Sequence, residues 1–413
     1  MLLIVFGDKL VVDPKGSCGK IQALPKRKVL MEFATFLLDE WLGKHQFSNP
    51  PVAYDLASST GPGWTFRQLL ELADAEERER ILDAKVGYTP AAGTPALREA
   101  IAEMQGVQPD EVQVTTGAAE ALLVLFSLAA EPGANVVVPS PGFPPFDEVP
   151  RTLGLEVRHY SLRRENAYRV DLSAIRTLTD ARTKLVLMNS PHNPTGATLS
   201  DGEMESLHDF LAERGIQFVV DEVYHPIYYG PMTASAARLP QATVVSDFSK
   251  ALSLAGLRTG WLVERNRKRM SSYREARSYF TVSNTSMGEG LAAVAVRQRE
   301  KILARARQIS AANLERLDGF FARFQDVFGW VRPVGGMTAF PWLISGENSR
   351  AFCEEAARGG VLLAPGDCFG LPAHFRIGFA ASGERFPEGL ERLADLLTRV
   401  RVGGERQTAG VRC

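Results

Sequence analysis

One stretch of the chain decides its fold: residues 184–221 read KLVLMNSPHNPTGATLSDGEMESLHDFLAERGIQFVVD. An apolar run opens this stretch, and a turn with two prolines and a glycine follows it. Apolar residues then recur at helical spacing, with Leu207, Phe210 and Leu211 on one stripe, before a second apolar run at 217–220. Strand, helix and strand in this order are typical of a parallel sheet that helices cover on both faces.

The same alternation extends in both directions along the chain. Apolar runs that predict buried strands recur at residues 136–139 and 243–245. We therefore expect an α/β fold, with ligands at the carboxyl ends of the strands. After about residue 300 the pattern changes to a long charged helix at 301–324 and short strands at 328–331 and 337–340, which predict a smaller mixed sheet.

The composition is that of an ordinary globular chain, with 45% hydrophobic and 23% charged residues among 413. Its 47 Lys and Arg residues nearly balance its 48 Asp and Glu residues, so the formal charge of -1 provides no field that would attract nucleic acid. At about 150 residues per domain, the length predicts two domains.

Cysteine spacing and hydropathy exclude several other classes of protein. The chain has no C-x-x-C pair and no run approaching the ~18 apolar residues of a membrane span. We therefore expect a cytoplasmic protein with no disulfide scaffold, no metal and no membrane partner. The first twenty residues are either an arm that lies on a partner subunit or an artefact of the start site. The four scattered cysteines are Cys18, Cys353, Cys368 and Cys413.

Two of the predicted strands end in turns of unusual composition. Residues 115–121 read TTGAAEA, and small residues at a helix N-terminus form either an anion seat or an ordinary cap. Residues 189–196 read NSPHNPTG, which holds Asn193 rigidly between two prolines or is simply a turn. His192 in this turn either supports a site or is an ordinary turn residue.

Two further strands are followed by charged residues. Asp221 follows a predicted buried strand, where a carboxylate requires a cation or several hydrogen bonds. Lys250 follows the next strand. Desolvation lowers the pKa of a lysine and favours the nucleophilic amine that Schiff-base chemistry needs, whereas the alternative is a surface lysine.

Taken in order, these segments resemble one family. Ser249-Lys250 with Arg258 eight residues later, preceded by Asn193-Pro194-Thr195-Gly196 and Asp221-x-x-Tyr224, is similar to the fold type I, class I/II aminotransferases that depend on pyridoxal 5'-phosphate (PLP). The resemblance extends from about residue 55 to 378. It implies a large domain with a mostly parallel seven-stranded sheet sandwiched by helices, plus a smaller α+β domain.

The resemblance also implies domain boundaries. An N-terminal arm and part of the small domain would occupy residues 1–75, the large PLP-binding domain residues 76–300, and the C-terminal small domain residues 301–413.

For the cofactor ring, the resemblance implies a role for five residues. Lys250 would form the Schiff base with PLP and move the substrate proton, and Asp221 would pair with the pyridine nitrogen. Tyr224 and Asn193 would bind the phenolic oxygen of the ring. Phe143 would stack on the face of the ring.

For the cofactor phosphate, the resemblance implies a seat of backbone N–H groups and the Arg258 guanidinium. The family usually has Ser or Thr three positions before the lysine, but this chain has Asp247, and a carboxylate repels a phosphate dianion. We expect Ser246 or Ser249 to take over the donor role. The backbone seat would consist of Gly117, Ala118 and Ala119.

Three further residues are implied at the active site, one for the cofactor and two for the substrate. Tyr88, in a Tyr-x4-Gly-x3-Leu-Arg element, would reach the phosphate of a neighbouring subunit, which implies a homodimer with shared active sites. Arg376 would bind the substrate α-carboxylate as a bidentate fork. Gly61, in a substrate loop at 55–66, and Asn193 would also contact the substrate.

The expected function is an aminotransferase of amino-acid metabolism, which acts on an L-amino acid with a 2-oxo acid as acceptor. Residues 55–66 and 335–341 resemble the branch of the family that contains capreomycidine synthase, so a PLP-dependent cyclase or a β-elimination or β-replacement lyase is the alternative. A cofactor-sensing transcription regulator of this fold would carry a fused DNA-binding domain and a basic patch, neither of which we find in the sequence.

Overall fold

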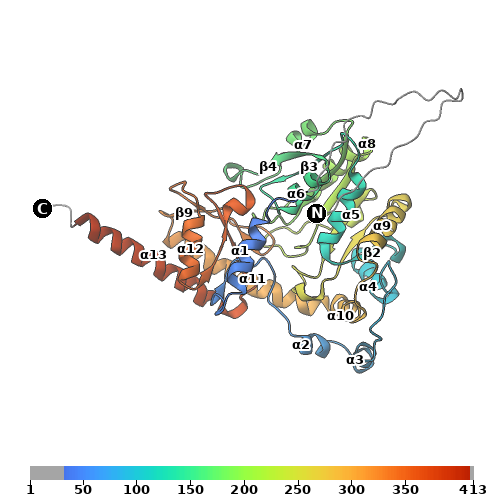
Figure 1. Ribbon diagram of the computed structural model, residues 1–413, viewed down its shortest axis with the longest axis horizontal. Coiled ribbons are helices and arrows are strands. Elements are labelled where there is room, and N and C mark those ends of the chain that lie inside the picture. The colour runs from blue at the N-terminus through green and yellow to red at the C-terminus, as the bar shows by residue number, and fades with distance from the viewer. Residues whose placement is uncertain (1–31, 410–413) are drawn as a thin grey trace, which may run out of the picture.

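The computed structural model describes residues 32–409, with side chains described as far as residue 399. The first twenty residues, Cys18 and Cys413 lie outside the described part. Figure 1 places one large sheet with its helices beside a smaller group of helices and short strands. Within residues 32–409 no helix is long and apolar enough to cross a membrane.

A seven-stranded sheet forms the centre of the larger part, in the order β2-β8-β7-β6-β5-β3-β4. Strand β8 is antiparallel to both its neighbours, and every other pair is parallel. The mostly parallel α/β architecture predicted from the sequence is therefore confirmed. The strands are β2 (Val112–Thr115), β3 (Asn135–Ser140), β4 (Glu156–Ser161), β5 (Thr183–Asn189), β6 (Gln217–Asp221), β7 (Ala242–Asp247) and β8 (Gly260–Val263).

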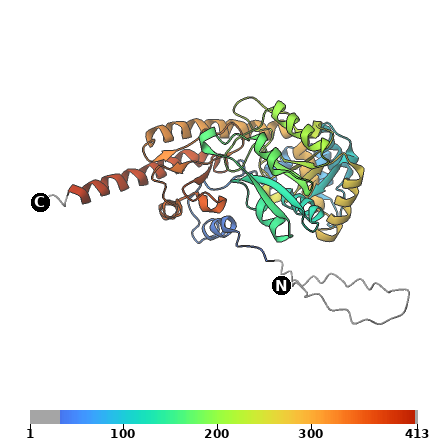
Figure 2. The same ribbon diagram turned by 90° about the horizontal axis from the view of Figure 1, so that it is seen from above.

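Helices cover this sheet on both faces (Figure 2). The helix in the stretch that decides the fold, α8, begins with a capping box in which Ser200 accepts from the N–H of Glu203 and the Glu203 carboxylate accepts from Ser200. Leu207 and Leu211 on its apolar stripe are buried. The helices of this part are α2 (Phe66–Glu71), α3 (Ala75–Leu82), α4 (Pro95–Gln105), α5 (Gly117–Ala129), α6 (Pro145–Thr152), α7 (Leu172–Leu178), α8 (Asp201–Glu213), α9 (Arg267–Phe280) and α10 (Ser286–Arg297).

The smaller part contains three short sheets. Strand β1 (Tyr54–Asp55) pairs in parallel with β12 (Val361–Leu362), so segments far apart in the sequence lie side by side. The strands predicted at 328–331 and 337–340 are shorter in the structure. The remaining strands are β9 (Phe328–Gly329), β10 (Thr338–Ala339), β11 (Trp342–Leu343), β13 (Ala364–Pro365) and β14 (Phe375–Gly378).

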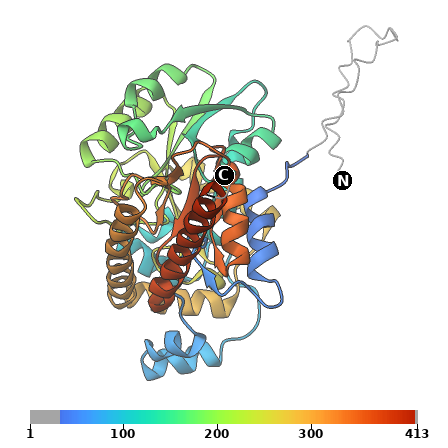
Figure 3. The same cartoon turned by 90° about the vertical axis from the view of Figure 1, so that its left-hand side faces the viewer.

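Four helices belong to the smaller part, and two of them, α11 and α13, are long. Figure 3 shows α11 and α13 side by side. The predicted domain boundaries at 75 and 300 stay a prediction. The helices are α1 (Leu37–Gln46), α11 (Arg299–Arg323), α12 (Arg350–Arg358) and α13 (Phe386–Ala409), and the single 3-10 turns are Pro109–Glu111, Arg164–Asn166, Ala236–Arg238, Ala255–Leu257, Gly366–Phe369 and Gly383–Arg385.

Candidate active site

A cavity of about 210 Å³ lies at the carboxyl ends of β5, β6 and β7, where α/β sheets bind their ligands. The turns after β2 and β3 contribute further wall residues. Among the residues predicted from the sequence, those that line it are Ala118, Ala119, Phe143, Asn193, Asp221, Tyr224, Ser249, Lys250 and Arg258.

Lys250 is half-buried at the centre of this arrangement. Its Nζ donates to the Oγ of Ser59 at 2.9 Å. Burial lowers the pKa of the amine to about 8, because desolvation disfavours the ammonium form. A lysine with this pKa has a substantial neutral fraction near physiological pH, as a nucleophilic amine requires.

Asp221 ends β6 and is buried, and among the described residues it forms no ion pair. The N–H of Val223 donates to its Oδ1 at 3.1 Å, and its backbone carbonyl accepts from the N–H of Ser190 at 3.0 Å. Burial raises the pKa of this carboxyl to about 7, and the neighbouring charge of Asp247 acts in the same direction. The site therefore has a buried acid whose ionised form requires a cationic partner from a ligand.

The side chains of Tyr224 and Asn193 are each held by a hydrogen bond to a residue outside the large sheet. The Tyr224 hydroxyl donates to the carbonyl of Ser59 at 3.0 Å, and burial raises its pKa to about 12. The Asn193 Oδ1 accepts from Arg376 at 3.2 Å. Both side chains line the cavity and are held in place by these hydrogen bonds.

Arg376 lies on β14 of the smaller part and is almost fully buried. One amino group donates to Asn193, and the other donates to the carbonyl of Ala57 at 2.8 Å. Its Nε has no hydrogen-bond partner among the described residues. The guanidinium therefore has donor capacity left for a carboxylate.

The start of α5 and Arg258 form a compact cradle. Gly117 has φ +74°, and the Arg258 Nη2 lies 2.8 Å from the point where a Cβ on Gly117 would stand. A side chain at Gly117 would therefore separate the guanidinium from the first N–H groups of α5. These groups have the charge and the donors that a phosphate requires.

Asp247 lies beside this cradle and, unlike the other groups there, has a carboxylate that would repel a phosphate. Its Oδ2 lies 3.5 Å from the backbone nitrogen of Ala118, and it accepts from the hydroxyl of Ser249 at 2.8 Å. The other candidate donor, the Ser246 hydroxyl, donates to the carbonyl of Glu222 at 3.3 Å. In this arrangement both serine hydroxyls are engaged by acceptors of the protein itself.

Two predicted residues are placed differently from the rest. Tyr88 is 89% exposed in the single chain and pairs with Thr285, away from the cavity. Gly61 packs against the turn that carries the lysine, where a Cβ would stand 2.0 Å from the Ser253 Oγ and 3.1 Å from the carbonyl of Lys250. A larger residue at Gly61 would displace that turn.

Sequence reasoning missed Ser59 and Ala57. Both belong to the predicted substrate loop at 55–66, in which only Gly61 was singled out. The pairing of β1 with β12 brings this loop over Lys250, and small polar residues in a loop at a cavity were the signal available. His192 lies in its turn with Nδ1 2.8 Å from the Thr195 hydroxyl, and burial lowers its pKa to about 3.

A larger cavity of about 670 Å³ adjoins the first, and Phe143 and Phe146 line both. Phe143 contacts Phe146 edge to face at a centroid distance of 5.7 Å. The residues before α1, the start of α6 and the loop at 368–370 supply the other walls. The ionisable side chains on its wall, Cys368 apart, are Asp147, Glu148 and His159.

Comparison with known proteins gives a consistent result. A family model for aminotransferase class I and II matches residues 55–395. Capreomycidine synthase from Streptomyces vinaceus is 30% identical over 376 residues, which cover 90% of this chain and 96% of that protein. A probable aspartate/prephenate aminotransferase from Aquifex aeolicus is 29% identical and covers 78% of this chain and 86% of that protein.

Solved structures agree with these relatives. A PLP-dependent aminotransferase from Streptococcus suis has a TM-score of 0.83 at 28% identity and covers 89% of this chain and 98% of that one. The PLP-dependent cyclase OrfR has a TM-score of 0.80 at 26% identity and covers 92% and 100%. The resemblance predicted from the motifs, including the weaker one to capreomycidine synthase, is confirmed.

Proposed function

The chain belongs to the aminotransferase class I and II family of PLP-dependent enzymes, and from that premise we propose that it transfers the amino group of an L-amino acid to a 2-oxo acid. One observation carries the proposal. Lys250, with its lowered pKa, and Asp221, a buried acid without an ion pair among the described residues, line one cavity.

The residues around the cavity fit PLP in charge and in shape. The Arg258 guanidinium and the N–H groups at the start of α5 would hold the phosphate. Asp221 would hold the pyridine nitrogen in its protonated form, and Phe143 would cover the face of the ring. When bound, PLP serves as an electron sink for negative charge that develops on the substrate Cα.

The substrate would be oriented by Arg376 and its neighbours. The unpartnered Nε and the two amino groups of this guanidinium present a fork to the α-carboxylate, with Asn193 holding one side of it. The Lys250 amine, once free, would take the proton from Cα and return it, because its pKa of about 8 permits both directions near neutral pH.

A direct test uses borohydride reduction followed by peptide mapping. We expect reduction to attach PLP covalently to the peptide that contains Lys250 and to no other peptide. The variant Lys250→Ala should bind PLP without covalent attachment, and trapping of PLP in that variant would refute the assignment of the nucleophile.

A second candidate function is a PLP-dependent cyclase or lyase of specialised amino-acid metabolism. The observation that favours it is the similarity to capreomycidine synthase and to the cyclase OrfR. Incubation with a panel of amino acids and one 2-oxo acid, followed by mass spectrometry, separates the two candidates. A new amino acid derived from the acceptor supports transamination, whereas ammonia or a cyclised product without consumption of the acceptor supports the second candidate.

We also propose a homodimer with shared active sites. Exposed apolar side chains lie close in sequence to the two partners of the bridge between Tyr88 and Thr285, including Val86 and Tyr279, which are 91% and 90% exposed. An exposed apolar area of this kind is typical of a subunit interface, and a second copy is the occupant that would bring Tyr88 to the phosphate of its neighbour.

Subunit mixing tests this arrangement. Tyr88→Ala and Lys250→Ala should each have low activity as separate dimers. If Tyr88 acts across the interface, their mixture should recover activity, because hybrid dimers contain one site with both residues intact. A mixture no more active than the sum of its components would contradict the shared site.

A further inference from the structure

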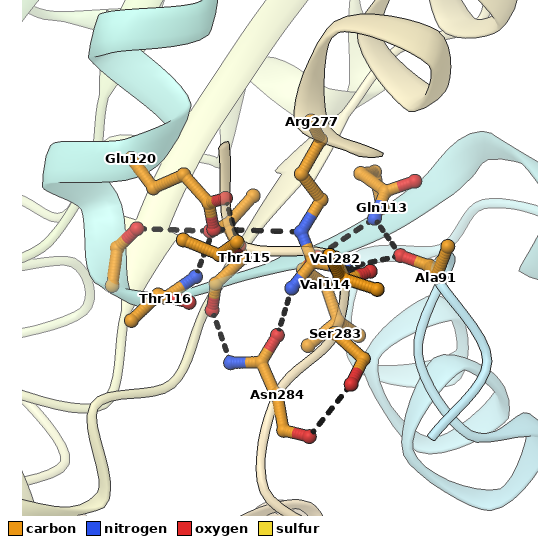
Figure 4. A network of polar contacts seen from close by, with 12 residues as sticks. Ala91, Gln113, Val114, Thr115, Thr116, Glu120, Arg277, Val282, Ser283 and Asn284 are labelled. Carbon is orange, nitrogen blue, oxygen red and sulfur yellow. Dashed lines mark hydrogen bonds and ion pairs between the residues drawn. The ribbon is translucent and has the colours of Figure 1, made fainter. Parts of the chain in front are cut away.

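Figure 4 shows a cluster of buried polar residues beside the start of α5. The cluster is hydrogen-bonded to Thr116 and to the carbonyl of Arg258, next to the phosphate cradle, and does not line the cavity. Its centre is the guanidinium of Arg277 on α9, which is 1% exposed, with Glu120 on α5 and Asn284 after α9. We call these three residues the Arg277 cluster. A charge buried this deeply requires an opposite charge and hydrogen-bond acceptors around it.

Arg277 joins three segments of the chain. Its Nε lies 3.4 Å from a Glu120 carboxylate oxygen, and its amino groups donate to the carbonyls of Val282 and Ala91 and to the Asn284 Oδ1. Ala91 belongs to the loop that carries Tyr88. The guanidinium therefore links α9 to the start of α5 and to the segment expected at the subunit interface.

Glu120 fixes the turn into α5. It lies in the first turn of the helix and accepts from the backbone N–H of Thr116 and from the hydroxyl of Thr281. Thr116 directly precedes Gly117, the first residue of the cradle. The carboxylate thus satisfies an N–H that directly precedes the N–H groups of the cradle.

Asn284 contacts the backbone of Arg258, which provides the guanidinium of the cradle. Its Nδ2 donates to the carbonyl of Thr115 at 2.9 Å and to the carbonyl of Arg258 at 3.3 Å. Arg258 has φ +49°, a left-handed conformation that is unfavourable for a residue with a side chain. This hydrogen bond therefore helps to keep the backbone of Arg258 in the conformation that places its guanidinium beside Gly117.

We propose that Arg277, Glu120 and Asn284 are positioning residues for the cofactor phosphate. They would set the distance between the N–H groups of α5 and the Arg258 guanidinium, although none of them touches the ligand. The proposal concerns the cofactor alone and holds for transamination and cyclisation alike.

The test compares two ligands that differ only in the phosphate. The affinity of the cofactor-free chain for PLP and for pyridoxal is measured by titration of the cofactor absorbance. For Asn284→Ala, which removes three hydrogen bonds without changing charge, we expect about 10-fold weaker binding of PLP and less than about a 3-fold change for pyridoxal. Arg277→Lys should change the same ratio in the same direction.

A matched control lies on the same helix. Arg269 on α9 pairs with buried Glu264 at 2.8 Å, and neither residue contacts the cradle. Arg269→Gln should lower the melting temperature while leaving the ratio of PLP to pyridoxal affinity unchanged. If the cluster variants weakened both ligands equally, or if Arg269→Gln changed the ratio as much as they do, the cluster would be a general structural element and the proposal would be wrong.

Discussion

At the scale of the residue, the site contains ionisable groups whose charged forms are disfavoured by desolvation when no ligand is bound. The pKa of Asp221 is raised to about 7 and that of Lys250 is lowered to about 8, both chiefly by desolvation. Each group therefore has a pKa close to neutral pH, so a ligand of complementary charge can change its protonation state.

The raised pKa of Asp221 predicts how the stability of the cofactor-free chain depends on pH. Between about pH 4 and 7 the folded chain keeps a proton that the unfolded chain has released, so the free energy of unfolding falls as pH rises through this window. Asp221→Asn removes this dependence. We expect the variant to gain up to about 4 kcal/mol relative to wild type between pH 4 and 7.

Urea unfolding of both cofactor-free proteins at pH 5 and pH 8 measures this gain. The difference between variant and wild type should be clearly smaller at pH 5 than at pH 8, where it reaches its maximum. A difference that did not vary with pH would show that Asp221 is ionised in the folded chain.

The carboxylate of Asp247 predicts that PLP binding in this chain is weaker than the cradle alone would allow. A negative charge near the Ala118 nitrogen repels a phosphate dianion, so Asp247→Ser should tighten PLP binding by about 10-fold. Asp247→Asn removes the charge without adding a hydroxyl and should give most of the gain. Weaker PLP binding in both variants would mean that the carboxylate supports the site instead, through its bonds to Ser249.

At the scale of the element, the start of α5 is the part of the site most sensitive to geometry. Gly117 has a positive φ and also packs against Gly260, whose own Cβ would stand 2.8 Å from the Gly117 Cα. This close backbone approach brings β8 and α5 together beside Arg258.

This packing predicts the effect of Gly117→Ala. The added methyl group meets the Arg258 guanidinium, and alanine costs about 1 kcal/mol in a left-handed conformation. We expect a melting temperature lower by a few degrees and PLP binding at least about 10-fold weaker. Gly215→Ala provides a control, because Gly215 has φ +65° but open space around its Cβ position. Equal PLP affinity in the two variants would contradict a role for the cradle.

At the scale of the whole molecule, the two adjoining cavities are made by segments from the entire chain. The large sheet and its turns provide Lys250 and Asp221, while the smaller part provides the loop at 368–370 and, through its hydrogen bond to Asn193, Arg376. The larger cavity has phenyl rings and two carboxylates on its walls, and Asp147 is paired with Arg151 at 2.7 Å. Glu148 forms no ion pair with any described residue and adds a negative charge to this wall.

A cavity of this character predicts substrate preference. An amino acid with an acidic side chain would meet Glu148 and the phenyl rings, so we expect L-aspartate and L-glutamate to react at least about 10-fold more slowly than L-phenylalanine or L-leucine. Stopped-flow absorbance of the first half-reaction measures these rates without an acceptor. Glu148→Gln should narrow the difference, whereas a preference of the wild type for L-aspartate would exclude this cavity as the side-chain site.

The sequence alone determined much of this protein. Continuous apolar runs predict strands buried on both faces, because parallel strands covered by helices have no polar face. Asn193, Asp221 and Lys250 each follow a strand whose carboxyl end lies at one edge of the sheet, so their positions predict that they meet. Arg258, which lies just before β8, was implied by the family resemblance. The apolar runs and the residues that follow them lie in short stretches of sequence, so the strands and these site residues could be predicted.

Only the tertiary structure decided which distant segments complete the site. Ser59 reaches Lys250 because β1 pairs with β12, and no periodicity in the sequence encodes that pairing of two-residue strands. Arg277 gave no recognisable motif, since its importance arises from burial against Glu120 and Asn284. Contacts between remote segments depend on how whole layers pack, and packing is a property of the folded chain that a local pattern does not contain.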